Sequence, residues 1–516
     1  MKKRLLFVLA TLLIFGSGKA QQQPTHYPFN YHDFPNTMTA IIQIQINGVE
    51  QTSNELELGA FNGDMITGAE RIGCYGSHGY YRVYLSVYGS SGSYEVTFKL
   101  YNHQTGDELD NCVITYQGEP YTFTWVSDTG IGSNKKPIVL NFITGQTFTK
   151  EITGYGNGNG NWYLIASPIA NETQPENVVG LLSNSYDLYW FDQTQDMEWR
   201  NYKHGGGFNL VSGMGYLYAN SQNDTLKFTG TPIEGNTYEV SLVKDDDANL
   251  PGWNLVGNPF TETAYIDRPF YVMNESRTGI IAATVNSIPA MEGVFVVAAE
   301  DGEGLSFTTI NPNTKGSMVA LNLSKGHNVI DRTIVHFGKE LSLPKFQLRN
   351  NSTKIYITQD DIDYAIVCSE GIGEMPVSFK AEENGQYTLS FTAEEVSFSY
   401  LHLIDNMTGA DTDLLANPSY SFEASTTDYA SRFKLVYAVN DGPSTGSGTF
   451  AFFSNGKLII VNEGQATLQV IDTTGRVIKS KNINGSAEIN ANEVAGVYML
   501  RLVKGDNIKT QKIVVR

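Results

Sequence analysis

AGVYMLRLVKGDNIKTQKIVVR, residues 495–516, closes the chain and shows the pattern that decides its fold. Large apolar side chains occupy every second position from Tyr498 to Leu502, and this period of two predicts a β-strand. Residues 505–507 supply a turn, and residues 508–515 form a second strand-like run. Chain ends are normally the loosest part of a domain. A regular hairpin here therefore indicates a segment with a role of its own.

The composition extends this pattern to the whole chain. With 516 residues the protein is too long for one hydrophobic core, and about three to four domains are expected. Glycine (50), tyrosine (29) and phenylalanine (26) are abundant, which is typical of short strands joined by tight turns. We predict an all-β protein of several tandem β-sandwich domains, immunoglobulin-like or jelly-roll-like, with a small C-terminal β-sandwich. The net charge of −19 argues against a nucleic-acid partner and against docking on anionic lipid.

The first residues have the pattern of a secretory signal peptide. Residues 2–4 are basic, residues 5–15 are apolar, and Gly18-Lys19-Ala20 forms a small-x-small cleavage site. The apolar run is too short to span a bilayer, and no other segment approaches the length of a transmembrane helix. We therefore predict a cleaved signal peptide at residues 1–20 and a mature protein outside the cytoplasm.

Next come a leader and a first domain. Residues 21–31 form a polar leader, and residues 32–144 carry the pattern of an N-terminal β-sandwich. Isoleucine and glutamine alternate through residues 42–46, and Asn47-Gly48 is a strong hairpin signal.

Residues 151–309 contain an internal duplication. Three pairs of segments recur in the same order: WYLIASPI (162–169) with WNLVGNPF (253–260), GMGYLYANS (213–221) with MEGVFVVAAE (291–300), and LKFTG (226–230) with LSFTT (305–309). Recurrence in one order predicts two related β units, about 162–230 and 253–309, packed with pseudo-two-fold symmetry.

The remaining chain gives one more domain and a linker before the C-terminal hairpin. Strand-like runs at 354–358, 387–391 and 433–439 predict an immunoglobulin-like domain over residues 317–439. DGPSTGSG, residues 441–448, has the composition of a flexible linker.

Catalytic and metal-binding signals are sparse. The sequence has no HExxH, GxSxG or P-loop motif, and its eight histidines form no ligand pair. Cys74 and Cys112 either pair as a disulfide or are buried free thiols, and Cys368 is left over. No cofactor is expected apart from Ca²⁺, for which three acidic clusters would supply oxygen ligands. The alternative is that these clusters are solvated turns. These clusters are Asp245, Asp246 and Asp247; Asp360, Asp361 and Asp363; and Asp405, Asp411 and Asp413.

Aromatic side chains offer another candidate. Tyr186, Trp190 and Trp199 lie in a polar stretch, where they form either a platform for sugar rings or a protein partner, or part of the core. Tyr186, Leu188 and Trp190 share one strand parity, and Tyr189 and Phe191 share the other. At least one of these two sets is therefore expected in the core.

The C-terminal segment resembles a known family. VIDTTGRVI (470–478), AGVYMLRL (495–502) and QKIVVR (511–516), which follows Gly505, match in order the type A C-terminal sorting domain of the type IX secretion system. The resemblance places this domain at residues 450–516. The matching positions are Asp472, Gly475, Arg476, Gly496, Tyr498, Arg501, Gly505, Lys512, Val514 and Val515.

The resemblance implies a route and a location. In that family the cargo leaves the cytoplasm through its signal peptide and crosses the outer membrane of a Gram-negative bacterium by contact with the type IX machinery. The domain is often cleaved, and the cargo is attached to surface lipopolysaccharide or released. Residues 373–391 and 400–415 also resemble a module common among this cargo, to which no activity belongs.

Two classes of function follow. We expect a non-enzymatic, adhesin-like protein, secreted or at the cell surface, that binds glycan or protein ligands through its β modules. The alternative is a secreted glycan-active hydrolase with a pair of carboxylates that no motif reveals.

Overall fold

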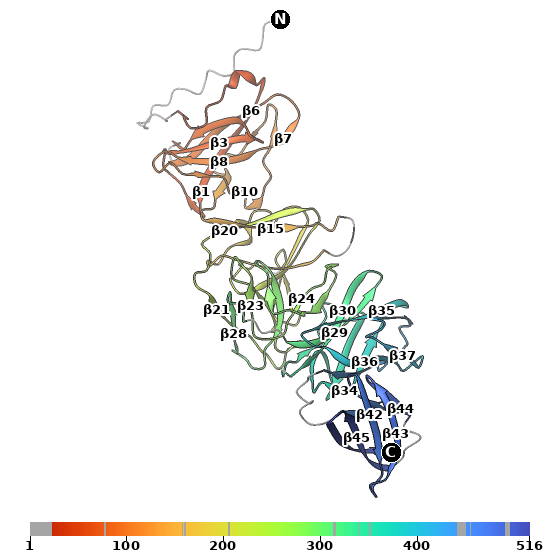
Figure 1. Ribbon diagram of the computed structural model, residues 1–516. Helices are drawn as coiled ribbons and strands as arrows, with labels where there is room; N and C mark the ends of the chain where they lie inside the picture. The colour runs from red at the N-terminus through yellow and green to blue at the C-terminus, as the bar shows by residue number, and fades with distance from the viewer. Residues whose placement is uncertain are drawn as a thin grey trace.

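A computed structural model describes most of the chain after the predicted signal peptide. It describes residues 23–76, 79–156, 158, 161–204, 207–312, 316–338, 340–349, 352–440, 450–454, 456–490 and 496–515. The predicted signal peptide (1–20) and linker (441–448) lie outside these residues. The described chain is all-β, as predicted, with two single-turn 3₁₀ helices, η1 (Tyr31–Asp33) and η2 (Pro175–Asn177). Its domains follow one another in a row from the N-terminus to the C-terminus (Figure 1).

In the part of the chain that the structure describes, no helix has the length and apolar character needed to cross a membrane.

The first domain is a β-sandwich. One sheet has the order β11-β10-β14-β1-β6-β5, and the facing sheet has the order β4-β3-β8-β9. Alternate side chains of both sheets, such as Ile42, Leu58, Val83 and Phe98, meet in a common core. The strands are β1 (Asn36–Ile46), β2 (Val49–Glu50), β3 (Leu56–Asn62), β4 (Met65–Arg71), β5 (Gly73–Tyr75), β6 (Tyr80–Gly89), β7 (Ser93–Glu95), β8 (Thr97–Asn102), β9 (Glu108–Leu109), β10 (Cys112–Tyr116), β11 (Glu119–Pro120), β12 (Thr124–Val126), β13 (Gly130–Ile131) and β14 (Ile138–Phe142).

Part of the expected leader belongs to this domain. The backbone N–H groups of Thr25, His26 and Tyr27 donate to the carboxylate of Glu57 on β3, over 2.8 to 2.9 Å. The ring of Tyr27 lies against Gly59, where a Cβ atom would come within 2.8 Å of the ring atom Cδ2. The domain therefore begins before His32, because residues 25–27 are bound by Glu57 and Gly59. The alternation of apolar residues alone does not reveal this contact.

The Cys74–Cys112 disulfide is not formed, since both thiols are free. Cys74 lies on β5 and Cys112 on β10, and three strands of the same sheet lie between them. Strands are spaced about 4.8 Å apart, so the two cysteines are separated by roughly 19 Å, whereas a disulfide needs about 4.4–6.8 Å between Cα atoms.

The second region consists of two halves with the same topology. The order β16-β19-β17-β18 in the first half matches β22-β27-β24-β25 in the second, and each half adds a second sheet. The first half contains β15 (Gln146–Ile152), β16 (Tyr163–Ala166), β17 (Tyr186–Phe191), β18 (Trp199–Asn201), β19 (Gly215–Asn220) and β20 (Asp224–Gly230). The second contains β21 (Thr237–Ser241), β22 (Trp253–Gly257), β23 (Ala264–Tyr265), β24 (Tyr271–Met273), β25 (Ile280–Ala282), β26 (Ser287–Ile288), β27 (Gly293–Val297) and β28 (Gly304–Thr308).

The two halves meet at equivalent positions. Ile165 forms a β-bridge with Glu292, and Met214 forms one with Val256. Ile165 and Val256 correspond in the duplicated segments, as do Met214 and Glu292. This reciprocal pairing is the contact pattern of a local two-fold axis.

The third domain is built on one long hydrogen-bonded path of strands. The order is β37-β36-β39-β34-β32-β33-β30-β29-β35-β38, and it closes around a core that includes Leu321, Ile355, Phe379 and Leu435. The strands are β29 (Ser317–Lys325), β30 (Asn328–Phe337), β31 (Leu343–Pro344), β32 (Lys354–Gln359), β33 (Ile362–Ser369), β34 (Ile372–Lys380), β35 (Gly385–Glu394), β36 (Phe398–Asp405), β37 (Ala410–Asp413), β38 (Ser419–Ala424) and β39 (Phe433–Val439).

The C-terminal domain is a small β-sandwich with its own core. A sheet of order β40-β41-β44 faces a sheet of order β43-β42-β45-β46. Leu458, Leu468, Leu500 and Ile513 are buried between them. The strands are β40 (Ala451–Ser454), β41 (Lys457–Ile460), β42 (Gln465–Ile471), β43 (Val477–Asn484), β44 (Ala487–Asn490), β45 (Gly496–Lys504) and β46 (Asn507–Val515). The smaller sheet contacts the third domain. Its Ile459 packs against Ile404 and Val436 of that domain.

Candidate functional sites

One turn of the C-terminal domain is held together by hydrogen bonds to an aspartate. Between β42 and β43, Asp472 Oδ1 accepts hydrogen bonds from the backbone N–H groups of Thr474 and Arg476, at 3.0 and 2.9 Å, and from the Thr474 hydroxyl at 2.6 Å. Led by the Thr474 hydroxyl, these bonds lower the pKa of the Asp472 carboxyl to about 2. Gly475 has a φ of +87°, which a side chain would strain, so the DTTGR segment is a turn with one stable geometry.

The outer face of the four-stranded sheet β43-β42-β45-β46 is the second feature of this domain. Strand parity places Gln469, Met499, Arg501, Lys512 and Val514 on this outward face, opposite the core. Arg501 Nε donates to Gln469 Oε1 at 2.8 Å. None of the outward positions of β42, β43, β45 and β46 is acidic. We call this surface the sorting face.

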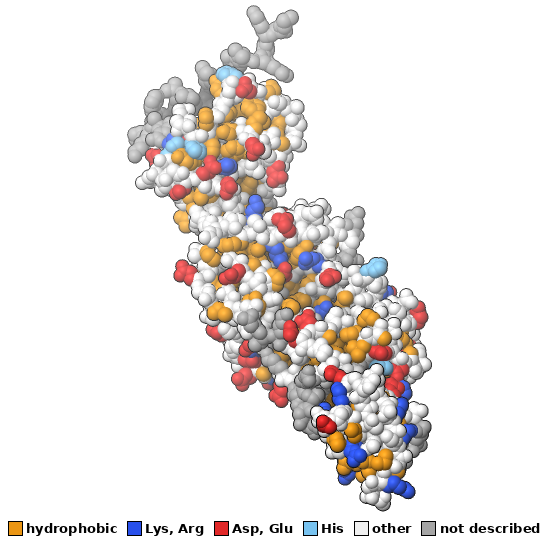
Figure 2. Space-filling model, viewed as in Figure 1, with side chains coloured by type: hydrophobic (Ala, Val, Ile, Leu, Met, Phe, Trp, Pro, Cys, Tyr) orange, Lys and Arg blue, Asp and Glu red, His pale blue; other side chains and the backbone are white. Residues whose placement is uncertain are grey.

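Charge sets this domain apart from the others. Residues 450–516 hold nine Lys and Arg and five Asp and Glu, whereas the whole chain has a net charge of −19. Several of these cations are visible at its surface in Figure 2, and the domains before it expose scattered Asp and Glu. A basic face on an acidic protein favours a partner with acidic groups.

The predicted aromatic candidates of the second region are half buried. Trp190 packs into the core of the first half, and Arg200 lies over its ring at 5.2 Å. Trp199 packs into the cluster shared with the third domain, with its ring 5.1 Å from that of Phe191. Lys203 Nζ covers the ring of Tyr186 at 4.3 Å. The structure therefore does not bring these three residues together as an open platform.

A different aromatic surface occurs on the first domain. Tyr80, Tyr84 and Tyr88 share the outward parity of β6, because Val83, Leu85 and Val87 point into the core. We call this the tyrosine surface. It consists of Phe29, Tyr31, Tyr75, Tyr80, Tyr84 and Tyr88. The alternation YYRVYLSVY at residues 80–88 carried this signal, but the choice of face needed the core to be known.

Ring contacts and hydrogen bonds hold this surface in place. The Tyr88 ring lies 5.5 Å from Phe29 and 6.1 Å from Tyr31, which is 52% exposed. The Tyr75 ring meets Tyr84 edge-on at 3.9 Å, and the Tyr84 hydroxyl donates to Asn134 Oδ1 at 2.8 Å. Such rings lose little conformational freedom when a ligand stacks on them.

The acidic clusters of the sequence have separate surroundings. Asp405 is buried and bonded to Arg432 through both carboxylate oxygens, so it is not available to a cation. Asp411 lies with His402 and Glu488 in a group whose ligand atoms are within 4.8 Å of one another. Lys457 Nζ contacts Glu488 at 2.7 Å and Asp411 at 3.3 Å, and its positive charge balances one of the two carboxylates of this group. Asp363 contacts Lys354 at 3.2 Å, and Asp246 contacts Lys244 at 2.9 Å.

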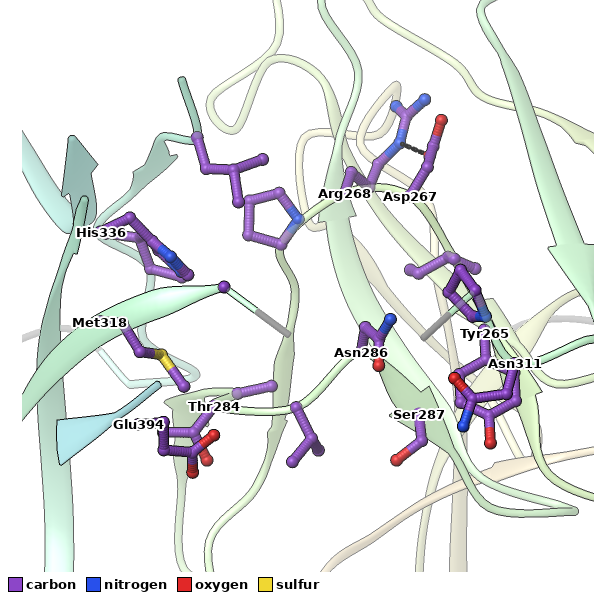
Figure 3. A pocket seen from close by; sticks show the side chains of 18 of the residues that line it. Tyr265, Asp267, Arg268, Thr284, Asn286, Ser287, Asn311, Met318, His336 and Glu394 are labelled. Atoms are coloured by element: carbon purple, nitrogen blue, oxygen red, sulfur yellow. Dashed lines mark ion pairs between the residues drawn. The ribbon is translucent and has the colours of Figure 1, made fainter. Parts of the chain in front are cut away.

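A pocket of about 580 Å³ lies where the second region meets the third domain. Figure 3 shows Tyr265, Asp267, Arg268 and Asn311 on one side and His336, Met318 and Glu394 on the other. Arg268 is paired with Glu303 at 2.8 Å and lies 3.6 Å from Asp267. Asp267 and Glu394 lie on opposite sides, and apart from these two and Arg268 the lining is a mixture of apolar side chains and polar side chains such as Asn286, Ser287 and His336.

Comparison with known proteins supports the C-terminal reading. Residues 454–516 match the family model of the secretion system C-terminal sorting domain. This confirms the resemblance on which the sequence analysis relied: the chain carries a type IX sorting domain and is cargo for export. The matched range spans the ten predicted motif positions, from Asp472 to Val515, whose individual roles stay a prediction.

Other comparisons add little. No curated protein matches the chain. Among solved structures, the chain is similar to one described as "Biofilm associated protein - BSP domain", with 8% identity over 96% of this chain and 98% of that chain. The TM-score of 0.13 means that the two structures do not superpose as wholes, and this likeness carries no argument about function.

Proposed function

We propose that the protein is an adhesin-like, non-enzymatic binding protein that reaches the cell surface or the medium by type IX secretion. The observation that carries the proposal is the placement of its two surfaces. The sorting domain forms one end of the row of domains, and the domain with the tyrosine surface forms the other (Figure 1). A protein held or delivered by its C-terminal end would present the tyrosine surface farthest from that end.

The tyrosine surface suits a glycan ligand. Aromatic rings bind the apolar faces of sugar rings, and side-chain hydroxyl and amide groups between them bind sugar hydroxyls. Thr37 and Thr39 of β1 lie in register with Tyr88 and Ser86 and supply such polar groups. Arg82, the cation beneath the surface, is buried and paired with Glu50 at 2.8 Å. A neutral oligosaccharide therefore fits better than an anionic one.

Replacing tyrosine-surface rings should weaken glycan binding. On a glycan array, the full chain with Tyr84→Ala or Tyr88→Ala should bind its glycan at least about tenfold more weakly, because a lost ring contact costs about 1.4 kcal/mol or more. Tyr429→Ala removes a ring that is 47% exposed on the third domain, and this matched control should bind normally. Equal loss in all three variants, or hydrolysis of a glycan without retained binding, would contradict the proposal.

We also propose that the export machinery contacts the sorting face. Arg501→Glu combined with Lys512→Glu reverses both cations of this face without touching the core, and should lower surface-exposed protein at least about tenfold, since like charges at an interface are costly. Lys481→Glu combined with Lys509→Glu makes the same change of charge off the sorting face and should export normally. Quantitative surface immunolabelling measures both variants. Equal export of the two would show that the machinery reads another surface.

A further inference from the structure

The described residues of the third domain include two ion pairs in which both side chains are almost fully buried. Arg432 Nη2 contacts Asp405 Oδ2 at 3.0 Å, with 3% and 0% of the two side chains exposed. Lys345 Nζ contacts Asp331 Oδ1 at 2.6 Å, with 2% and 1% exposed. Arginine is the usual partner in a buried pair because its guanidinium stays charged and binds with two N–H groups. Lysine differs, because its amine can lose a proton and become a nucleophile.

The surroundings of Lys345 favour the uncharged amine. The residue follows β31 and lies in the apolar junction of the second region and the third domain, beside Leu343 and Phe346. Burial lowers the pKa of the Lys345 amine and raises that of the Asp331 carboxyl, in each case against the pull of the partner's charge. The 2.6 Å hydrogen bond lets the proton pass from nitrogen to Oδ1, which leaves an amine beside a carboxylic acid.

The backbone around the pair holds both groups in place. Ile355 N–H donates to Asp331 Oδ2 at 2.8 Å. The Tyr271 hydroxyl donates to Pro344 O at 3.0 Å and accepts from Phe346 N–H at 2.9 Å, so the backbone on both sides of Lys345 is fixed. Two groups held in contact in this way react as if present at very high concentration.

We propose that Lys345 and Asp331 condense to an intramolecular isopeptide bond. The uncharged Nζ attacks Cγ of the carboxylic acid, and Ile355 N–H stabilises the negative charge that develops on Oδ2. A proton passes from the nitrogen to Oδ1, the Cγ–Oδ1 bond breaks, and Oδ1 leaves as water. The product is an Nζ–Cγ amide, and no other reactant is consumed. Arg432 and Asp405 cannot react in this way, because the guanidinium stays protonated.

This cross-link would tie β30 to the segment that follows β31. The described residues contain no disulfide, since all three cysteines are free. Small exported domains commonly rely on covalent cross-links for stability. An amide would supply such a cross-link and would also remove two buried ionisable groups, whose charged forms are costly to keep in an apolar interior.

Intact mass spectrometry of the purified, denatured full chain tests the proposal. The wild-type protein should be lighter than its sequence mass by one water molecule, and Lys345→Arg, whose guanidinium does not attack, should have its full sequence mass. A water lost elsewhere is distinguished by trypsin digestion. The linked product is a branched peptide in which GHNVIDR (326–332) is joined to ELSLPKFQLR (340–349), with no cleavage after Lys345. A full-mass wild-type protein that yields these segments unlinked, with cleavage after Lys345, would overturn the proposal.

Discussion

Removal of residues 450–516 is expected to reduce the protein outside the cell to background while the rest of the chain still folds. The sorting domain has its own buried core, and the cores of the first and second regions contain no residue from it. Its loss should therefore remove the export signal and leave those domains intact. Residues 1–20 are predicted to direct passage across the inner membrane, so the truncated protein is expected to collect in the periplasm. Cell fractionation with immunodetection measures this distribution.

The deletion needs a control for the surface that it uncovers. Ile404 and Val436 of the third domain pack against Ile459 of the sorting domain, and deletion exposes them. The truncated protein should therefore be tested for protease resistance in the periplasmic fraction, so that retention is not confused with misfolding. A protease-resistant truncated protein that still reaches the cell surface would show that export does not depend on residues 450–516.

The local sequence pattern was sufficient to predict the structure wherever a strand and its turn are neighbours in the sequence. The alternation at residues 498–502 and the glycine at 505 predicted the β45–β46 hairpin, and Gly505 has a φ of +59° at the turn. Asn47 and Gly48 likewise have positive φ values, 49° and 79°, as the hairpin signal requires. In these cases the residues that decide the structure all lie within one short segment.

Long-range contacts could not be predicted in this way. Parity shows that Tyr84 and Val83 point to opposite faces of β6, but only the packed sheets show which face is core. The polar stretch left Trp199 as either a surface platform or part of the core, and the partner that decides this, Phe295, lies 5.9 Å away in the other half of the duplication. Lys345 gave no signal at all, because its partner Asp331 precedes it by 14 residues and lies on β30.

Glu57→Ala should destabilise the first domain strongly. Glu57 is fully buried and accepts backbone bonds from residues 25–27, and its Oε2 lies 2.6 Å from His103 Nε2 and 3.6 Å from Arg71 Nε. The alanine would leave these donors without their acceptor, at a cost of about 3–5 kcal/mol. Whole domains are stable by only about 5–15 kcal/mol, so the loss should be visible in denaturant unfolding. Glu55→Gln, at a carboxylate 3.9 Å from Arg71 with 39% of its side chain exposed, is the matched control and should change stability little.

The same carboxylate should make the contact between residues 25–27 and β3 sensitive to acid. Burial by itself raises the pKa of Glu57, but the N–H bonds from Thr25 and Tyr27 and the contact with His103 outweigh it, so the pKa lies below its ordinary value. A lowered carboxyl pKa contributes stability above the unfolded value of about 4.3, and this contribution is lost as the pH falls through the folded value. Hydrogen exchange should therefore show the amides of residues 25–27 protected at neutral pH and exposed in strong acid. In Glu57→Ala these amides should be exposed at every pH, because their acceptor is gone. Protection that persists in this variant would show that residues 25–27 are held by the contact of the Tyr27 ring with Gly59 instead.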